Sequence, residues 1–202
     1  MANGVLDRIY RTFGPGARLS RTDVSVLSVA MMIAALDGRI DESELMTFER
    51  LMKKCPGYNE KSGAQAMDKA IRAAGYLEVQ ARRLPERQLV DGFVEEAIDM
   101  LPDRFLCGSP AEVRRAIVMW TLMAMSDENY SAVERRAVTM LAARVAGAMS
   151  AIFTNVGRGL APSFCSGTVS AFLRRVEGLA SQLRQEATQA DAEEALRRLI
   201  EG

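Results

Sequence analysis

The chain has 202 residues, of which 49% are apolar and 26% are charged, with 26 basic and 26 acidic side chains. This length fits one domain with an extension, and the apolar share is enough for one sizeable core. A formal net charge of zero argues against a nucleic-acid-binding protein. Histidine is absent, which excludes Ser-His and Cys-His nucleophiles and His-ligated zinc. The composition therefore indicates a soluble globular protein that is not an enzyme of a common type and binds no nucleic acid.

The three cysteines, Cys55, Cys107 and Cys165, are widely spaced and form no CxxC motif. This usage is typical of a reduced compartment, where cysteines serve as small buried apolar residues. The N-terminal residues lack the apolar core of a secretory signal peptide, and no uninterrupted apolar run is long enough to span a bilayer. We therefore expect a cytoplasmic protein without a transmembrane segment.

Helical periodicity dominates the chain, and no stretch of strand length alternates between apolar and polar residues. The pattern predicts an all-α protein with an N-terminal arm over residues 1–20, a compact helical bundle over residues 21–149 and a C-terminal helical extension over residues 150–202. Proline and glycine separate most of the expected helices. These helices cover residues 23–36, 41–55, 60–74, a short stretch after Gly75, 85–100, 110–125 and 131–149, followed by helical stretches near 172–183 and 196–200.

A segment of the bundle is repeated at a constant offset of 90 residues, with residues 31–52 aligning over residues 121–142. Each copy reads as an apolar helix, an Asp, a short turn with one large apolar residue, an N-cap residue and a Glu seven positions after the Asp. We expect two pseudo-repeated helix-turn-helix units around a shared core. The matched pairs are Asp37 with Asp127, Ile40 with Tyr130, Asp41 with Ser131, Glu44 with Glu134 and Leu51 with Leu141.

The acidic residues of these turns have two interpretations. The spacing of Asp41 to Glu44, and of Ser131 to Glu134, fits a capping box, which explains both glutamates structurally. The aspartates that precede them stand at helix C-terminal ends, where the macrodipole disfavours an anion by about 0.3–1 kcal/mol. Such a carboxylate needs a compensating cation, which is either an arginine or a metal ion.

If the two turns converge, their carboxylates form an acidic pocket. All-oxygen ligands suit Ca²⁺ or Mg²⁺ and not zinc or copper. Neither turn is an EF-hand, because the second lacks Gly at the sixth loop position and has Val138 at the twelfth. We predict no catalytic residues and no other cofactor site. The candidate metal ligands are Asp37, Asp41, Glu44, Asp127, Glu128 and Glu134.

Over about residues 24–146 the chain resembles the TerB-like tellurite-resistance family. The resemblance implies a compact helical bundle whose paired acidic turns form a metal-binding surface. It also implies a bacterial cytoplasmic role in stress-related or envelope-associated complexes, without catalysis. Glu128 stands where the family has Gly, and the last 50 or so residues lie outside the match. The residues that carry it are Asp37, Gly38, Ile40 and Glu44 in the first copy and Asp127, Tyr130 and Glu134 in the second.

The C-terminal extension carries an apolar stripe at helical spacing. We expect this helix either to fold back on the bundle or to bind a partner protein or a second copy. Basic residues flank the stripe, which leaves peripheral membrane association as a further alternative. The stripe consists of Phe172, Leu173, Val176, Ala180 and Leu183, and the flanking residues are Arg174, Arg175 and Arg184.

Three functions follow from these features. The first is a non-enzymatic, TerB-like interaction module that binds a divalent cation through its acidic turns. The second is a purely structural, self-associating helical protein whose acids are only caps. The third is a magnesium-dependent hydrolase, for which the sequence supplies acids but neither a phosphate-cradling glycine loop nor an identifiable general base.

Overall fold

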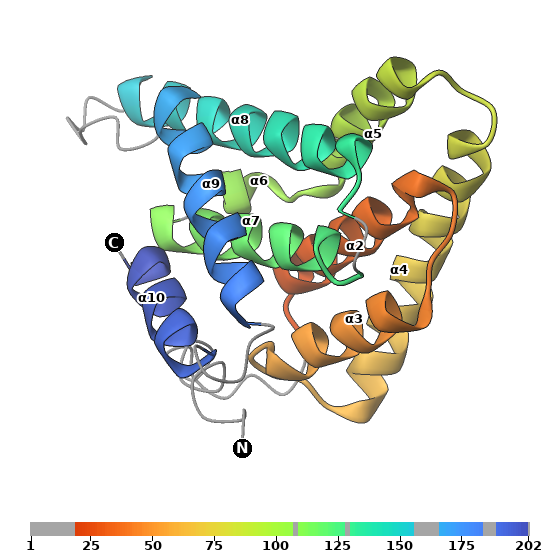
Figure 1. The fold of residues 1–202 in the computed structure, drawn as a ribbon, viewed down its shortest axis with the longest axis horizontal. Coiled ribbons are helices and arrows are strands. Elements are labelled where there is room, and N and C mark those ends of the chain that lie inside the picture. The colour runs from red at the N-terminus through yellow and green to blue at the C-terminus, as the bar shows by residue number, and fades with distance from the viewer. Residues whose placement is uncertain (1–18, 107–108, 128–129, 156–165, 184–188, 202) are drawn as a thin grey trace.

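The computed structural model describes residues 19–106, 109–127, 130–155, 166–183 and 189–201, and within them every regular element is a helix (Figure 1). The predicted all-α fold is confirmed. The elements are α2 (Arg21–Ala34), η1 (Ala35–Asp37), α3 (Glu42–Lys54), α4 (Glu60–Ala81), α5 (Glu86–Met100), α6 (Asp103–Leu106), α7 (Pro110–Ala124), α8 (Ala132–Asn155), α9 (Ser166–Leu183) and α10 (Gln189–Glu201).

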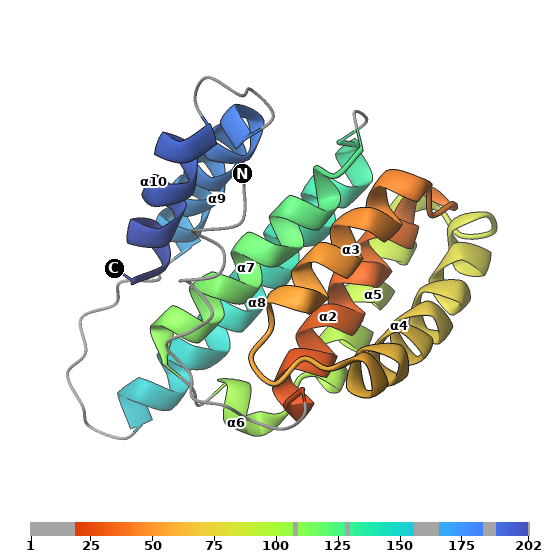
Figure 2. The ribbon, with the colours of Figure 1, turned by 90° about the horizontal axis from the view of Figure 1, so that it is seen from below.

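Helix α2 is buried along almost its whole length, as its nearly uninterrupted apolar sequence predicts. It packs mainly against α4 on one side and α7 on another. Figure 2 shows α7 and α8 in the middle of the molecule, with α2, α3, α4 and α5 on one side and the α9–α10 pair on the other. Two helical hairpins, α2–α3 and α7–α8, therefore meet along the α2–α7 contact.

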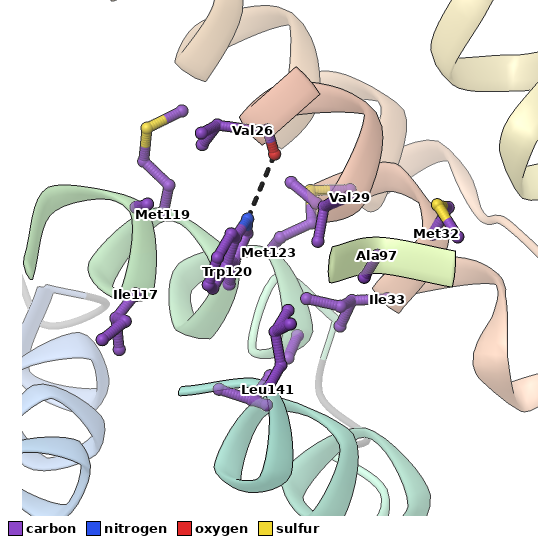
Figure 3. Packing of buried hydrophobic residues seen from close by; sticks show 14 of the residues in the cluster. Val26, Val29, Met32, Ile33, Ala97, Ile117, Met119, Trp120, Met123 and Leu141 are labelled. Carbon is purple, nitrogen blue, oxygen red and sulfur yellow. Dashed lines mark hydrogen bonds between the residues drawn. The ribbon is translucent and has the colours of Figure 1, made fainter. Parts of the chain in front are cut away.

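The single tryptophan joins these two hairpins. Trp120 on α7 is completely buried, and its indole N–H donates to the backbone carbonyl of Val26 on α2 at 3.1 Å (Figure 3). Its ring also lies against Phe105 of α6, with the ring centroids 6.5 Å apart. Because a buried indole needs an acceptor, this one hydrogen bond helps to fix how α7 lies against α2.

Helix α4 is longer than its sequence predicts. We expected one helix to end at Ala74 and a second to begin after Gly75, but α4 continues through Gly75 to Ala81. The buried face of Ala66, Ala70, Ala74 and Leu77 runs along both halves and packs against α2. A glycine inside a helix costs only about 1 kcal/mol, and the packing along this face outweighs it.

The C-terminal helices fold back onto the bundle. α9 contacts both α7 and α8, and α10 contacts α9 and α7. Phe172, Leu173, Val176 and Ala180 are buried there, with Leu183 partly buried, so this stripe is covered by the chain itself. α8 continues past the predicted end at Met149 to Asn155, and residues 156–165, with their glycines and proline, lie outside the described residues.

None of the helices in the described ranges combines the length and the apolar character needed to cross a bilayer.

Candidate cation site at the two acidic turns

The first acidic turn follows α2 directly. The chain tightens into η1 and reverses at Gly38, whose φ of 91° lies in the left-handed region that favours glycine. Asp37 accepts a hydrogen bond from the Arg39 backbone N–H at 3.0 Å, and its other carboxylate oxygen lies 3.6 Å from the Arg39 guanidinium. For Asp37, the compensating cation at the helix end is thus the neighbouring arginine.

The capping box that the sequence predicts at the start of α3 is formed. The Asp41 carboxylate accepts the Glu44 backbone N–H at 2.9 Å, and the Glu44 carboxylate accepts the Asp41 backbone N–H at 2.8 Å. Ser43 donates its hydroxyl to Asp41 at 2.7 Å. The hydrogen bonds from Glu44 and Ser43 lower the pKa of Asp41, so this carboxylate is ionised at neutral pH.

The second turn repeats this arrangement at the start of α8. The Ser131 hydroxyl accepts the Glu134 backbone N–H at 3.1 Å, and the Glu134 carboxylate accepts the Ser131 backbone N–H at 2.8 Å. Asp127 has intermediate exposure just after α7. Glu128, the sixth predicted ligand, lies outside the described residues.

The two capping glutamates are almost inaccessible to solvent, with Glu44 4% exposed and Glu134 2% exposed. The pKa of Glu44 is raised to about 8, mainly by burial and also by the charges of Asp41, Asp37 and Glu134, against the lowering effect of the hydrogen bond from the Asp41 backbone. Burial likewise raises the pKa of Glu134 to about 7, with contributions from the charges of Asp127 and Asp37. At neutral pH each carboxyl therefore holds a proton for much of the time.

These interactions connect the two turns. Asp37 belongs to the first turn but raises the pKa of Glu134 in the second, and Glu134 in turn raises the pKa of Glu44. Helix α8 also contacts η1, and α3 contacts α7. In Figure 2 the C-terminal ends of α2 and α7 lie at the same end of the bundle. The structure thus brings Asp37, Glu44 and Glu134 into one electrostatic neighbourhood.

The described side chains do not form a ready-made ligand shell. Across the described part of the chain, no group of three or more Asp, Glu, Cys or His side chains is arranged to hold a metal ion. One oxygen of each capping glutamate is engaged by a backbone N–H. A cation with all-oxygen ligands would have to displace the protons of these glutamates and draw the carboxylates toward itself.

Two groups from distant helices also hold the turns, and the local spacing of the sequence did not reveal them. Arg82 at the end of α4 donates to the Gly38 carbonyl at 3.2 Å. In the second turn, the Tyr130 hydroxyl donates to Glu177 of α9 at 3.0 Å. The one sequence signal for the second contact was the large apolar residue that each turn contains. In the second copy this residue is a tyrosine, whose hydroxyl can form a hydrogen bond.

Comparison with protein-family models, with curated proteins and with solved structures found no match to this chain. The resemblance to the TerB-like family stays a prediction that depends on the motif residues alone.

Proposed function

We propose that this chain is a non-enzymatic helical domain that binds Ca²⁺ or Mg²⁺ between its two acidic turns and presents the cation-bound surface to protein partners. The proposal is supported by the contact between η1 and α8 and by the electrostatic coupling of acids from both turns, since the charge of Asp37 raises the pKa of Glu134 and the charge of Glu134 raises the pKa of Glu44. A divalent cation relieves such repulsion, and carboxylate oxygens are the ligands that these two ions prefer.

The raised pKa values of Glu44 and Glu134 set the conditions for binding. Because a ligating carboxyl must be deprotonated, each bound cation releases the protons that these glutamates hold near neutral pH. The proposed affinity therefore increases as the pH rises through about 7 and 8. Asp37 is exposed and Asp127 is partly exposed, whereas Glu44 and Glu134 are buried, so a cation would meet these two aspartates before the glutamates.

The test is thermal unfolding of the full chain with increasing CaCl₂ or MgCl₂ at pH 6 and pH 8. A cation at 100 times its Kd stabilises the native state by about 2.7 kcal/mol, which raises Tm by roughly 5–10 °C in a domain of this size. We expect a larger shift at pH 8 than at pH 6. The double variant Asp37→Asn/Asp127→Asn should lose the shift.

A matched control removes two aspartates elsewhere. Asp68 and Asp91 are exposed, lie on α4 and α5, and pair with Arg72 and Arg87 on the surface. The double variant Asp68→Asn/Asp91→Asn changes the net charge equally and should keep the cation shift. A shift that is absent from the unchanged protein, or equal in both double variants, contradicts the proposed site.

One observation favours a second candidate, a purely structural interaction module that takes no metal. Both capping boxes are complete, so each buried glutamate already has a backbone donor within its own hairpin. In that case the acids serve only to start α3 and α8, and cations shift Tm no more than equivalent NaCl. The resemblance to the TerB-like family, which implies a stress-related or envelope-associated setting, favours the cation-binding candidate.

A further inference from the structure

The second acidic turn is fastened to the C-terminal helices by three side chains. The Tyr130 hydroxyl donates to Glu177 at 3.0 Å, and the Arg135 guanidinium lies 3.5 Å from the same carboxylate oxygen. The Arg135 guanidinium carbon also stands 4.9 Å from the centre of the Tyr130 ring. Each of the three contacts the other two, so we name this group the Tyr130–Arg135–Glu177 clasp.

The clasp distinguishes the second turn from the first. At the matching position the first turn has Ile40, which packs partly buried against the hydrophobic core. That turn is held from α4, through the hydrogen bond from Arg82 to Gly38. Among the described residues, the second turn is attached to α9 through Glu177, which is 47 residues from Tyr130 in the sequence. The connection therefore depends on the C-terminal helices being docked.

The environment of the clasp makes it sensitive to undocking. The Glu177 side chain is only 20% exposed, and a carboxylate that is partly removed from water needs its donors. Burial raises the pKa of Tyr130, as do the charge of Glu177 and the hydrogen bond to it, so the hydroxyl stays protonated and available as the donor. If α9 moves away, the turn loses this acceptor and Glu177 loses both partners.

A second polar contact holds the C-terminal pair at another place. The Arg114 guanidinium of α7 donates to the backbone carbonyl of Ile200 near the end of α10 at 2.8 Å. This contact shares no residue with the acidic turns. It provides a matched control, because breaking it loosens α10 without touching the clasp.

We propose that the Tyr130–Arg135–Glu177 clasp couples the second acidic turn to α9, so that a divalent cation at the turn and docking of the C-terminal helices stabilise each other. The cation half of this inference rests on the proposed function, whereas the link between turn and helix does not. By thermodynamic linkage, docking of the C-terminal helices increases the cation affinity by the same factor by which the bound cation increases the equilibrium constant for docking. The C-terminal helices thereby regulate the acidic site.

Hydrogen–deuterium exchange of the full chain, with and without CaCl₂, tests the coupling. Tyr130→Phe keeps the ring and removes the hydroxyl donor, and Glu177→Gln removes the charge. Each should speed amide exchange roughly fivefold both in residues 130–134 and in α9, as expected for the loss of one net hydrogen bond. Arg114→Met should speed exchange in α10 and leave residues 130–134 unchanged.

Each result decides one half of the proposal. Faster exchange in the turn without a change in α9, or in α9 without a change in the turn, overturns the link. If CaCl₂ binds the unchanged protein, Tyr130→Phe should weaken that binding severalfold, and an equal affinity overturns the coupling to the cation. If CaCl₂ does not bind the unchanged protein, the proposed function and the cation half fail together, while joint exchange changes in turn and α9 still support the link.

Discussion

Replacing Glu44 by Gln should stabilise the protein in alkaline solution. Glutamine has the same length and can still accept the Asp41 backbone N–H in the capping box, but it has no charge to bury. In the folded chain the pKa of Glu44 is raised to about 8 from its ordinary value of 4.5. The substitution therefore removes an ionisation that folding disfavours and leaves the local hydrogen bonding in place.

The sign of the pH dependence follows from proton linkage. Between pH 4.5 and pH 8 the native state holds the Glu44 proton more tightly than the unfolded chain does, so the free energy of unfolding falls as the pH rises. One pKa unit corresponds to about 1.4 kcal/mol, which gives an upper bound on the order of 4–5 kcal/mol for Glu44 alone. Because Glu134 also has a raised pKa and its charge acts on Glu44, the two carboxyls lose their protons in coupled steps. We expect Glu44→Gln to increase the free energy of unfolding by about 2–4 kcal/mol at pH 9.

Urea unfolding followed by circular dichroism at pH 5, 7 and 9 measures this effect. At pH 5 the Glu44→Gln variant and the unchanged protein should agree within about 1 kcal/mol, because native Glu44 is protonated there. At pH 9 the urea midpoint of the variant should be higher by about 1 M, given a typical dependence of about 2–3 kcal/mol per molar urea.

The control is Glu42→Gln, which changes an exposed glutamate in the first turn of the same helix. It should alter stability by less than about 0.5 kcal/mol, with no growing difference above pH 6. Suppose that Glu44→Gln lowers the free energy of unfolding at pH 9, and that this loss is at least as large as the loss at pH 5. The ionised form of Glu44 is then the stabilising one. The reasoning from burial would then be refuted.

Four further substitutions test the turns and the packing of the helices. Gly38→Ala places a side chain at a φ of 91° and should cost about 1–2 kcal/mol. Gly75→Ala lies inside α4, where nothing except the adjacent residues and the nearby backbone of the same helix comes within 4 Å of the added Cβ, and it should stabilise by about 0.5–1 kcal/mol. Urea midpoints that move in the same direction for both variants contradict this contrast. Trp120→Phe removes the hydrogen bond to Val26 and part of a fully buried ring, so we expect a loss of about 1–3 kcal/mol by thermal unfolding; an unchanged Tm means that the α2–α7 contact does not depend on the indole. Asp41→Ala removes the cap of α3 and should cost about 1 kcal/mol, measured by urea unfolding at pH 7; a neutral result assigns the start of α3 to packing alone.

The elements that the sequence predicted well are those controlled by neighbouring residues. The spacing of Asp41 to Glu44 and of Ser131 to Glu134 predicted two capping boxes, and both are formed. Helix α7 likewise starts at Pro110, as predicted, and the structure adds a capping box between its N-cap Ser109 and Glu112. These signals are reliable because each involves hydrogen bonds between residues three positions apart, which form without the rest of the fold.

Prediction was weaker where packing overrides a local signal. Gly75 indicated a break between two helices, but the buried face shared by both halves of α4 keeps them continuous. The fold-back of α9 was one of three open alternatives, because an apolar stripe predicts that a helix face will be covered but not what will cover it. Contacts with α7 and α8 decided that question.

The sequence by itself therefore determined an all-helical chain with two acidic turns, each ending in a capping glutamate. Only the tertiary structure decided that Glu44 and Glu134 are buried, that Asp37 acts on both, and that Tyr130 reaches Glu177. The physical reason is the distance in the sequence over which each interaction acts. A cap is made within one helical turn, whereas desolvation and carboxylate repulsion depend on which surfaces of distant helices exclude water together.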